Sequence, residues 1–166
     1  MNNKVRPGLL IFTIALPLAV GALSAMITGD MMKEYFFMNK PPLSPPSWIF
    51  PVVWTVLYIM MGFASYMVIN SGADRSLITK ALVLYGIQLV LNFFWSLLFF
   101  NSGLFLWAFI ELIAMWLVII FTTVMFFRAR TSAGVLMVPY ILWTTFAAYL
   151  NFAVYRLSTI PMPLPR

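Results

Sequence analysis

The sequence contains no cysteine and no histidine and has few acidic residues, and each of these absences excludes a class of chemistry. Without cysteine and histidine, the chain can form no disulfide, common zinc site, Ser-His-Asp or Cys-His arrangement, or histidine-ligated haem. A glycine-rich phosphate-binding loop is also missing. Asp30 and Glu34 lie in the stretch expected to be a loop, and Asp74 and Glu111 lie in other segments, so no expected helix presents a carboxylate pair. We therefore expect no conventional enzyme, no metal site and no required cofactor.

Charged residues of either sign are scarce. They make up 8% of the chain, against 63% hydrophobic residues, and the mean hydropathy is +0.98, far outside the range of soluble globular proteins. The net charge is +6, but the sequence has no basic run long enough for a nucleic-acid tract. A positive charge spread in this way suits anionic lipid headgroups. We expect one all-α integral membrane domain over residues 1–166, because the alternating segments of a β-barrel are missing.

Long apolar runs predict five transmembrane helices, since about 20 apolar residues cross a bilayer. Their expected bounds are 8–28, 48–70, 78–100, 104–127 and 134–157, with a proline-rich loop at 29–47. The break at residues 101–103 is so short that the third and fourth helices should be antiparallel neighbours. The first run also permits another reading, a secretory signal, because Lys4 and Arg6 precede it and Ala22 and Ser24 form a small-x-small pair.

Lysine and arginine residues give a weak prediction of orientation. An odd number of spans puts the two termini on opposite sides of the membrane. The N-terminal side would carry six of these residues and the other side four, namely Lys4, Arg6, Arg75, Lys80, Arg128 and Arg130 against Lys33, Lys40, Arg156 and Arg166. We expect a multi-pass protein of the bacterial cell membrane with its N-terminus inside.

Polar side chains inside the third run share one helix face. Gln88, Asn92 and Trp95 stand at i, i+4 and i+7. Such amides either form hydrogen bonds between helices, which contribute about 1 kcal/mol or less each on average, or contact a ligand. The spacing leaves both readings open.

Aromatic residues recur at helical spacing in the second and fifth runs. Trp54 and Tyr58 are four residues apart, and Trp143, Ala147 and Asn151 follow one another in the same way. The small Ala147 either lets another helix approach or leaves a recess for a flat ligand. Core packing and an interfacial aromatic belt are the competing explanations for each ring.

Glu111 is the only acid inside a predicted span, one turn beyond Trp107. A charge at the centre of a membrane helix costs about 2.5 to 3.5 kcal/mol on insertion scales, so this carboxyl should be protonated, paired or turned toward an internal cavity. An interfacial position with partial solvation is the alternative, because the residue lies near the start of its span.

Four stretches together resemble the TspO/MBR family of translocator proteins, also called tryptophan-rich sensory proteins. They are "KPPLSPPSWIFPVVWTVLYIMMG", "LVLYGIQLVLNFFWSLLFF", "WAFIELIAMWLVI" and "VPYILWTTFAAYLNFAVYRL", in the family's order and spacing from Lys40 to Leu157. The resemblance implies a five-helix bundle, commonly a homodimer, with a pocket under the first loop for porphyrins, sterols and flat drug-like molecules. It also implies that Trp54 and Trp143 are pocket tryptophans.

The resemblance and the helical spacing together give a set of expected ligand-binding residues. They are Trp54, Tyr58, Gln88, Asn92, Trp95, Trp107, Glu111, Trp143, Ala147, Leu150 and Asn151. The proline-rich loop should act as a preordered lid, because proline restricts the backbone. Its residues are Pro41, Pro42, Pro45, Pro46 and Trp48.

One departure from animal members bears on the choice of ligand. Their last helix carries a tyrosine after Leu-Asn in a cholesterol-recognition pattern, and Phe152 occupies that position here. Tetrapyrroles such as protoporphyrin IX are therefore favoured over sterols. We expect a receptor or sensor for porphyrin-type ligands. The alternatives are a transporter of tetrapyrroles or lipids, or an enzyme that degrades porphyrin with light and oxygen through Trp54 and Trp143.

Overall fold

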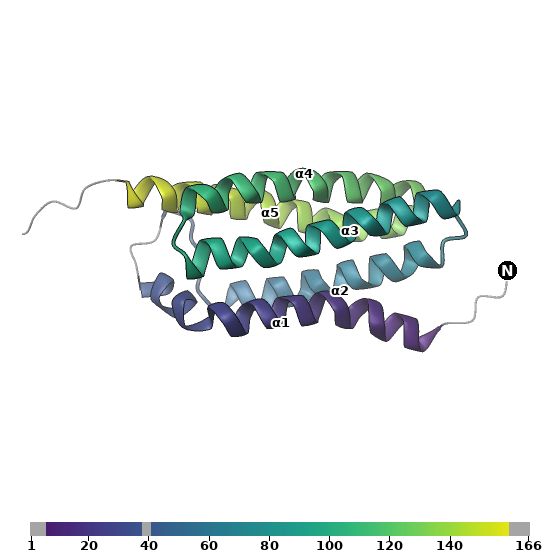
Figure 1. Cartoon of the computed structure of the whole chain (residues 1–166), viewed down its shortest axis with the longest axis horizontal. Helices are drawn as coiled ribbons and strands as arrows, with labels where there is room; N and C mark the ends of the chain where they lie inside the picture. Colours follow the sequence, from purple (N-terminus) through teal and green to yellow (C-terminus); the bar gives the residue numbers. More distant parts are fainter. Residues whose placement is uncertain (1–5, 38–40, 160–166) are drawn as a thin grey trace, which may run out of the picture.

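The computed structural model describes residues 6–37 and 41–159, and in the first range the side chains of residues 6–29. The described chain forms five long helices (Figure 1), and a π-helical turn extends the third. Their bounds are α1 Pro7–Phe37, α2 Ile49–Ile69, α3 Arg75–Ser96, η1 Leu97–Asn101, α4 Phe105–Ala129 and α5 Thr131–Ser158. All five are long and apolar enough to cross a membrane. The prediction of an all-α bundle with five spans is confirmed.

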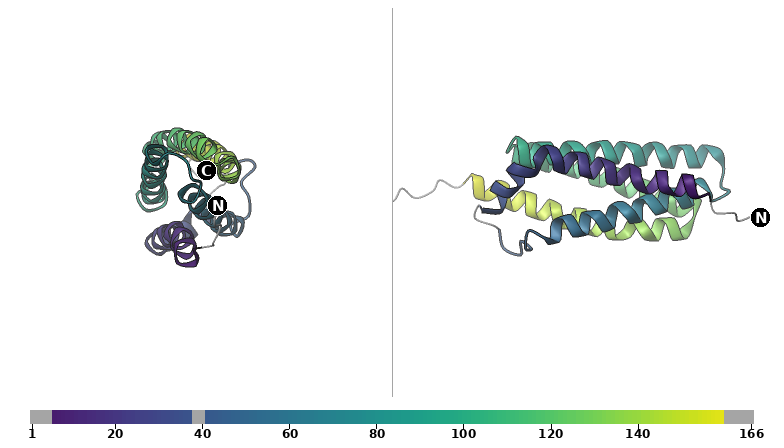
Figure 2. Two further views of the ribbon diagram at one scale, coloured as in Figure 1. Left: turned by 90° about the vertical axis from the view of Figure 1, so that its right-hand side faces the viewer. Right: turned by 90° about the horizontal axis from the view of Figure 1, so that it is seen from below.

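The helices lie along one long axis, and α1 starts at the end of the bundle opposite to the one where α5 finishes (Figure 1). Seen end-on, α1 lies at the outer edge beside α2 (Figure 2), and it packs mainly on α2 and η1. α3 and α4 are neighbours, as are α4 and α5. α3 and α4 are joined through Gly103, whose φ of +60° favours glycine.

Two expected boundaries require correction. The stretch predicted as loop from residue 29 is helical as far as Phe37, because good helix formers follow Gly29 and no proline occurs between Gly29 and Pro41. Asp30 and Glu34 therefore both belong to α1, which corrects the expectation that no helix carries a carboxylate pair. Only a short break separates α4 from α5, at Arg130, whose backbone is extended with φ −161° and ψ 120°. Lys40, in the expected lid stretch, lies outside the described residues.

The backbones of α1 and α2 approach closely at Gly62. A Cβ atom on this residue would lie 2.6 Å from the carbonyl oxygen of Thr13 and 2.7 Å from the Cα of Ile14. One turn before Gly62 on α2, the ring of Tyr58 covers Gly21 of α1. α1 is therefore packed as a member of the bundle, with small residues on both helices at the contact.

Candidate ligand pocket

A chain of buried hydrogen bonds joins α2, α3 and α5. The hydroxyl of Tyr58 donates to Oδ1 of Asn92 over 2.6 Å, and Nδ2 of Asn92 donates to the hydroxyl of Tyr140 over 3.2 Å. Tyr140 donates in turn to Oε1 of Gln88 over 2.8 Å. Gln88, Asn92 and Tyr140 are all at most 1% exposed. Both amides of α3 are thus engaged in joining helices in this structure, and contact with a ligand stays a prediction for them.

A second polar contact ties the other end of α3 to α5 and α4. The indole Nε1 of Trp95 donates to Oδ1 of Asn151 over 3.1 Å. The amide nitrogen of Asn151 donates to the backbone carbonyl of Phe105 over 2.8 Å, at the start of α4. The orientation of the Trp95 ring is therefore set by a hydrogen bond as well as by packing.

A pocket of about 380 Å³ lies between α1, α2 and the end of α3. The wall on α1 consists of small residues apart from Leu18, whereas the other wall is aromatic around Trp54. The ring of Trp54 lies 5.6 Å from Tyr58, 6.2 Å from Trp95 and 6.1 Å from Tyr140. The full lining is Leu18, Gly21, Ala22, Ser24, Ala25, Phe50, Pro51, Trp54, Thr55, Tyr58, Trp95, Ser96 and Phe100.

The π-helical turn η1 shapes one side of this pocket. The ring of Phe100 lies 6.0 Å from Trp95, five residues earlier, in an edge-to-face arrangement. Phe100, Ser96 and Phe50 were not among the expected site residues. No proline or glycine marks the turn within the segment Leu97–Asn101. A π turn is a rare feature that is often found at functional sites. The sequence carries no signal that would have predicted it here.

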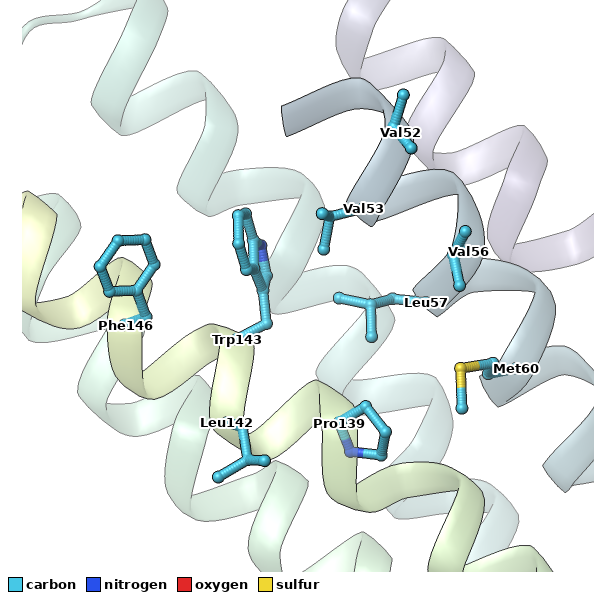
Figure 3. Close-up of a pocket in the computed structure, with 9 residues that line it drawn as sticks. All are labelled: Val52, Val53, Val56, Leu57, Met60, Pro139, Leu142, Trp143 and Phe146. Carbon is cyan, nitrogen blue, oxygen red and sulfur yellow. The ribbon is translucent and has the colours of Figure 1, made fainter. Parts of the chain in front are cut away.

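The expected site residues on α5 lie in two other places. Ala147, Leu150 and Asn151 line a small cavity of about 20 Å³ together with Phe50, Trp95, Phe99 and Phe100. Trp143 lines a groove of about 420 Å³ between α2 and α5 (Figure 3). Trp54 and Trp143 therefore line different cavities in this structure, and a shared role of the two rings in ligand binding stays a prediction.

The described part of the proline-rich loop is anchored to α5. Pro41 is buried, and the hydroxyl of Tyr149 donates to the carbonyl oxygen of Pro42 over 3.2 Å. Leu43 has φ +67°, which is unusual for a residue with a side chain, and is 78% exposed. Trp48 is also exposed and precedes the first turn of α2. Phe50, two residues further on, lines the pocket, so the position of the loop and that of the pocket wall are linked.

Tyr149→Phe is expected to loosen this loop without disturbing the bundle. One neutral hydrogen bond contributes about 0.5 to 1.5 kcal/mol net, so local opening should become roughly 2 to 12 times more frequent. Hydrogen exchange at the amides of Leu43 and Ser44 measures this change. Tyr155→Phe on the same helix is the control, and equal exchange rates in both variants would contradict a Tyr149 anchor.

Two further expected site residues lie away from the pockets described above. Trp107 is 62% exposed on the outer surface of α4. Glu111 is half-buried, and both of its carboxylate oxygens are enclosed with no hydrogen-bond partner among the described residues. A carboxyl enclosed in this way inside a membrane helix is expected to be neutral, because a charge without a partner is costly there.

Comparison with protein families matches residues 13–156 to the TspO/MBR family. The chain is 38% identical over 159 residues to "Tryptophan-rich protein TspO" of Chlorobaculum tepidum, covering 95% of this chain and 99% of that protein. It is 39% identical over 134 residues to "Tryptophan-rich sensory protein" of Cereibacter sphaeroides, covering 79% and 82%. It is also 33% identical over 146 residues to "Translocator protein" of Homo sapiens, covering 87% and 86%. The matched region extends from α1 to α5, and the chain belongs to the TspO/MBR family.

Proposed function

We propose that this protein is a membrane receptor or sensor that binds porphyrin-type tetrapyrroles in the pocket between α1, α2 and α3. The observation that carries the proposal is the ring of Trp54 at the centre of an aromatic wall, opposite a wall of small residues on α1. A slot with these two sides suits a flat conjugated molecule. Such a molecule can stack on the indole while its other face lies against Ala22 and Ala25.

The physical chemistry of the pocket supports a large apolar ligand. Its volume of about 380 Å³ falls within the range of about 300 to 1,000 Å³ usual for small-molecule sites. Aromatic pairs contribute about 0.5 to 1.5 kcal/mol beyond the burial of area. Tyrosine and tryptophan rings that are already held by hydrogen bonds lose little rotamer entropy when a ligand binds. Tyr58 and Trp95 both meet that condition.

The rest of the proposal concerns the setting of the protein. We place it as a homodimer in the bacterial cell membrane with its N-terminus inside. The orientation is supported by the six lysine and arginine residues assigned to that side against four on the other. Among its relatives, one is named a sensory protein and another a translocator protein, which supports a role in sensing or in transport.

Quenching of tryptophan fluorescence by protoporphyrin IX, in the dark and with purified protein in detergent, tests the binding proposal. Saturable quenching is expected, and Trp54→Phe should raise the Kd about 2- to 12-fold through the lost indole stacking. Trp107→Phe is the matched control, because that ring lies on the outer surface, and its Kd should not change.

Three results would each contradict the proposal. Quenching that does not saturate would indicate that the porphyrin only partitions into detergent. An equal Kd for wild type and Trp54→Phe would remove the pocket assignment. A product spectrum that appears on illumination of the wild-type complex would replace the receptor by a porphyrin-degrading enzyme.

A further inference from the structure

The groove between α2 and α5 opens on the outer surface of the membrane-spanning region. Val52, Val56 and Leu142 on its rim are 52%, 50% and 66% exposed, and the nine residues that line it are all apolar or aromatic. Figure 3 shows the indole of Trp143 standing in this groove, with Val53 and Leu57 opposite it on α2. In a bilayer, a groove with this lining at this place faces lipid chains.

Trp143 is held in the groove by packing alone. Its indole nitrogen is enclosed and has no hydrogen-bond partner among the described residues. Trp95, by contrast, is fixed by Asn151. Pro139 lines the groove one turn earlier and carries no N–H for the carbonyl of Val135, which weakens the helix at this point. The Trp143 ring can therefore turn without breaking a hydrogen bond to any described residue.

Behind Trp143, two aromatic contacts lead toward the main pocket. The ring of Phe50 lies 5.9 Å from that of Trp143, edge to face. Phe50 also lines both the small cavity beside Ala147 and the main pocket. Phe50 thus touches the groove through Trp143 and borders the other two cavities itself, so the pair of rings lies between the groove and these cavities.

We propose that the α2–α5 groove is a lateral entrance, through which a membrane-dissolved, flat, apolar ligand passes from the bilayer to the pocket when the Trp143 and Phe50 rings turn aside. The inference rests on the proposed binding function and adds the route by which the ligand arrives. A ligand that partitions into the hydrocarbon core is already concentrated beside this groove. Entry from the bilayer also spares the ligand a passage through water.

An entrance differs from a binding site in its kinetic signature. A residue that lines only the route changes the barrier for entry and exit equally, so kon and koff fall together and the Kd stays constant. Val56→Phe and Leu142→Trp each place bulk in the groove, from opposite walls, away from the main pocket. Val83→Phe is the control, because it adds the same bulk on the outer face of α3, away from the groove, where Val83 is 55% exposed.

Stopped-flow fluorescence on full-length protein in nanodiscs tests this proposal. Protoporphyrin IX gives kon, and excess apomyoglobin, which takes up released porphyrin, gives koff. Both groove variants are expected to slow both rates about tenfold, equivalent to about 1.4 kcal/mol added to the barrier, with Kd unchanged and Val83→Phe like wild type.

Unchanged rates in both groove variants would overturn the entrance. A raised Kd at constant kon would do so as well, because it would make the groove a binding site. These outcomes are distinct from failure of the proposed function, in which wild type itself shows no saturable binding.

Discussion

Gly62→Ala is expected to destabilise the protein by roughly 1 to 3 kcal/mol, the usual cost of forcing extra atoms into a packed contact. The new methyl group would meet the carbonyl oxygen of Thr13 at 2.6 Å and the Cα of Ile14 at 2.7 Å. Both are backbone atoms, so no side chain can rotate away. The whole of α1 must move from α2, and the pocket, which has α1 as one wall, should lose affinity for its ligand at the same time.

Gly86→Ala is the matched control for Gly62→Ala. Gly86 is also inside a membrane-spanning helix, but nothing lies within 4 Å of the position of its Cβ. Alanine in a helix is favoured over glycine by about 0.5 to 1 kcal/mol, so this variant should be as stable as wild type or more so. Thermal unfolding in one detergent at one scan rate measures both. Equal midpoints for the two variants would contradict the close contact of α1 and α2.

Much of the fold could be predicted from hydropathy alone. Each span is long, apolar and bounded by polar or turn-forming residues, so the existence of the five helices and their order could be predicted from the sequence. The boundaries were less accessible. The polar residues within 30–37 led to the prediction of a loop, yet this stretch continues α1. Hydropathy indicates whether a segment lies in the membrane, and it does not show whether the segment is helical. The short break at Arg130 has no proline or glycine to mark it.

The candidate site was predictable in its parts but not in its assembly. Helical spacing grouped Gln88, Asn92 and Trp95, and all three are buried on one face of α3. Which cavity a ring lines depends on how helices rotate against each other, and the spacing within one helix does not contain that information. Trp54 and Trp143 illustrate this, since helical spacing marks both as candidate site residues, yet they line different cavities.

The buried hydrogen bonds offer a way to separate the two readings of the α3 amides, as helix-joining groups or as ligand contacts. If they join helices, loss of a partner lowers stability and leaves the pocket much as it was. If they contact ligand, affinity changes at least as much as stability. Tyr140 is the residue on which this distinction can be made, because its hydroxyl serves both amides and lies outside the pocket lining.

Tyr140→Phe is expected to lower the free energy of unfolding by about 1 to 3 kcal/mol, since two buried groups lose their partner at once. Oε1 of Gln88 loses its donor and Nδ2 of Asn92 loses its acceptor. The phenylalanine ring can keep the edge contact with Trp54, so porphyrin affinity should change less than twofold. Tyr58→Phe removes one bond only, to Oδ1 of Asn92, and should cost about half as much.

Chemical unfolding in mixed micelles, paired with the quenching titration, measures stability and affinity in the same preparations. The double variant Tyr58→Phe/Tyr140→Phe should fall short of the sum of the two single effects, because both hydroxyls bond to Asn92 and the side chain can reorient once both are gone. A Tyr140→Phe variant that is as stable as wild type but binds porphyrin weakly would reverse the assignment and make the α3 amides ligand contacts.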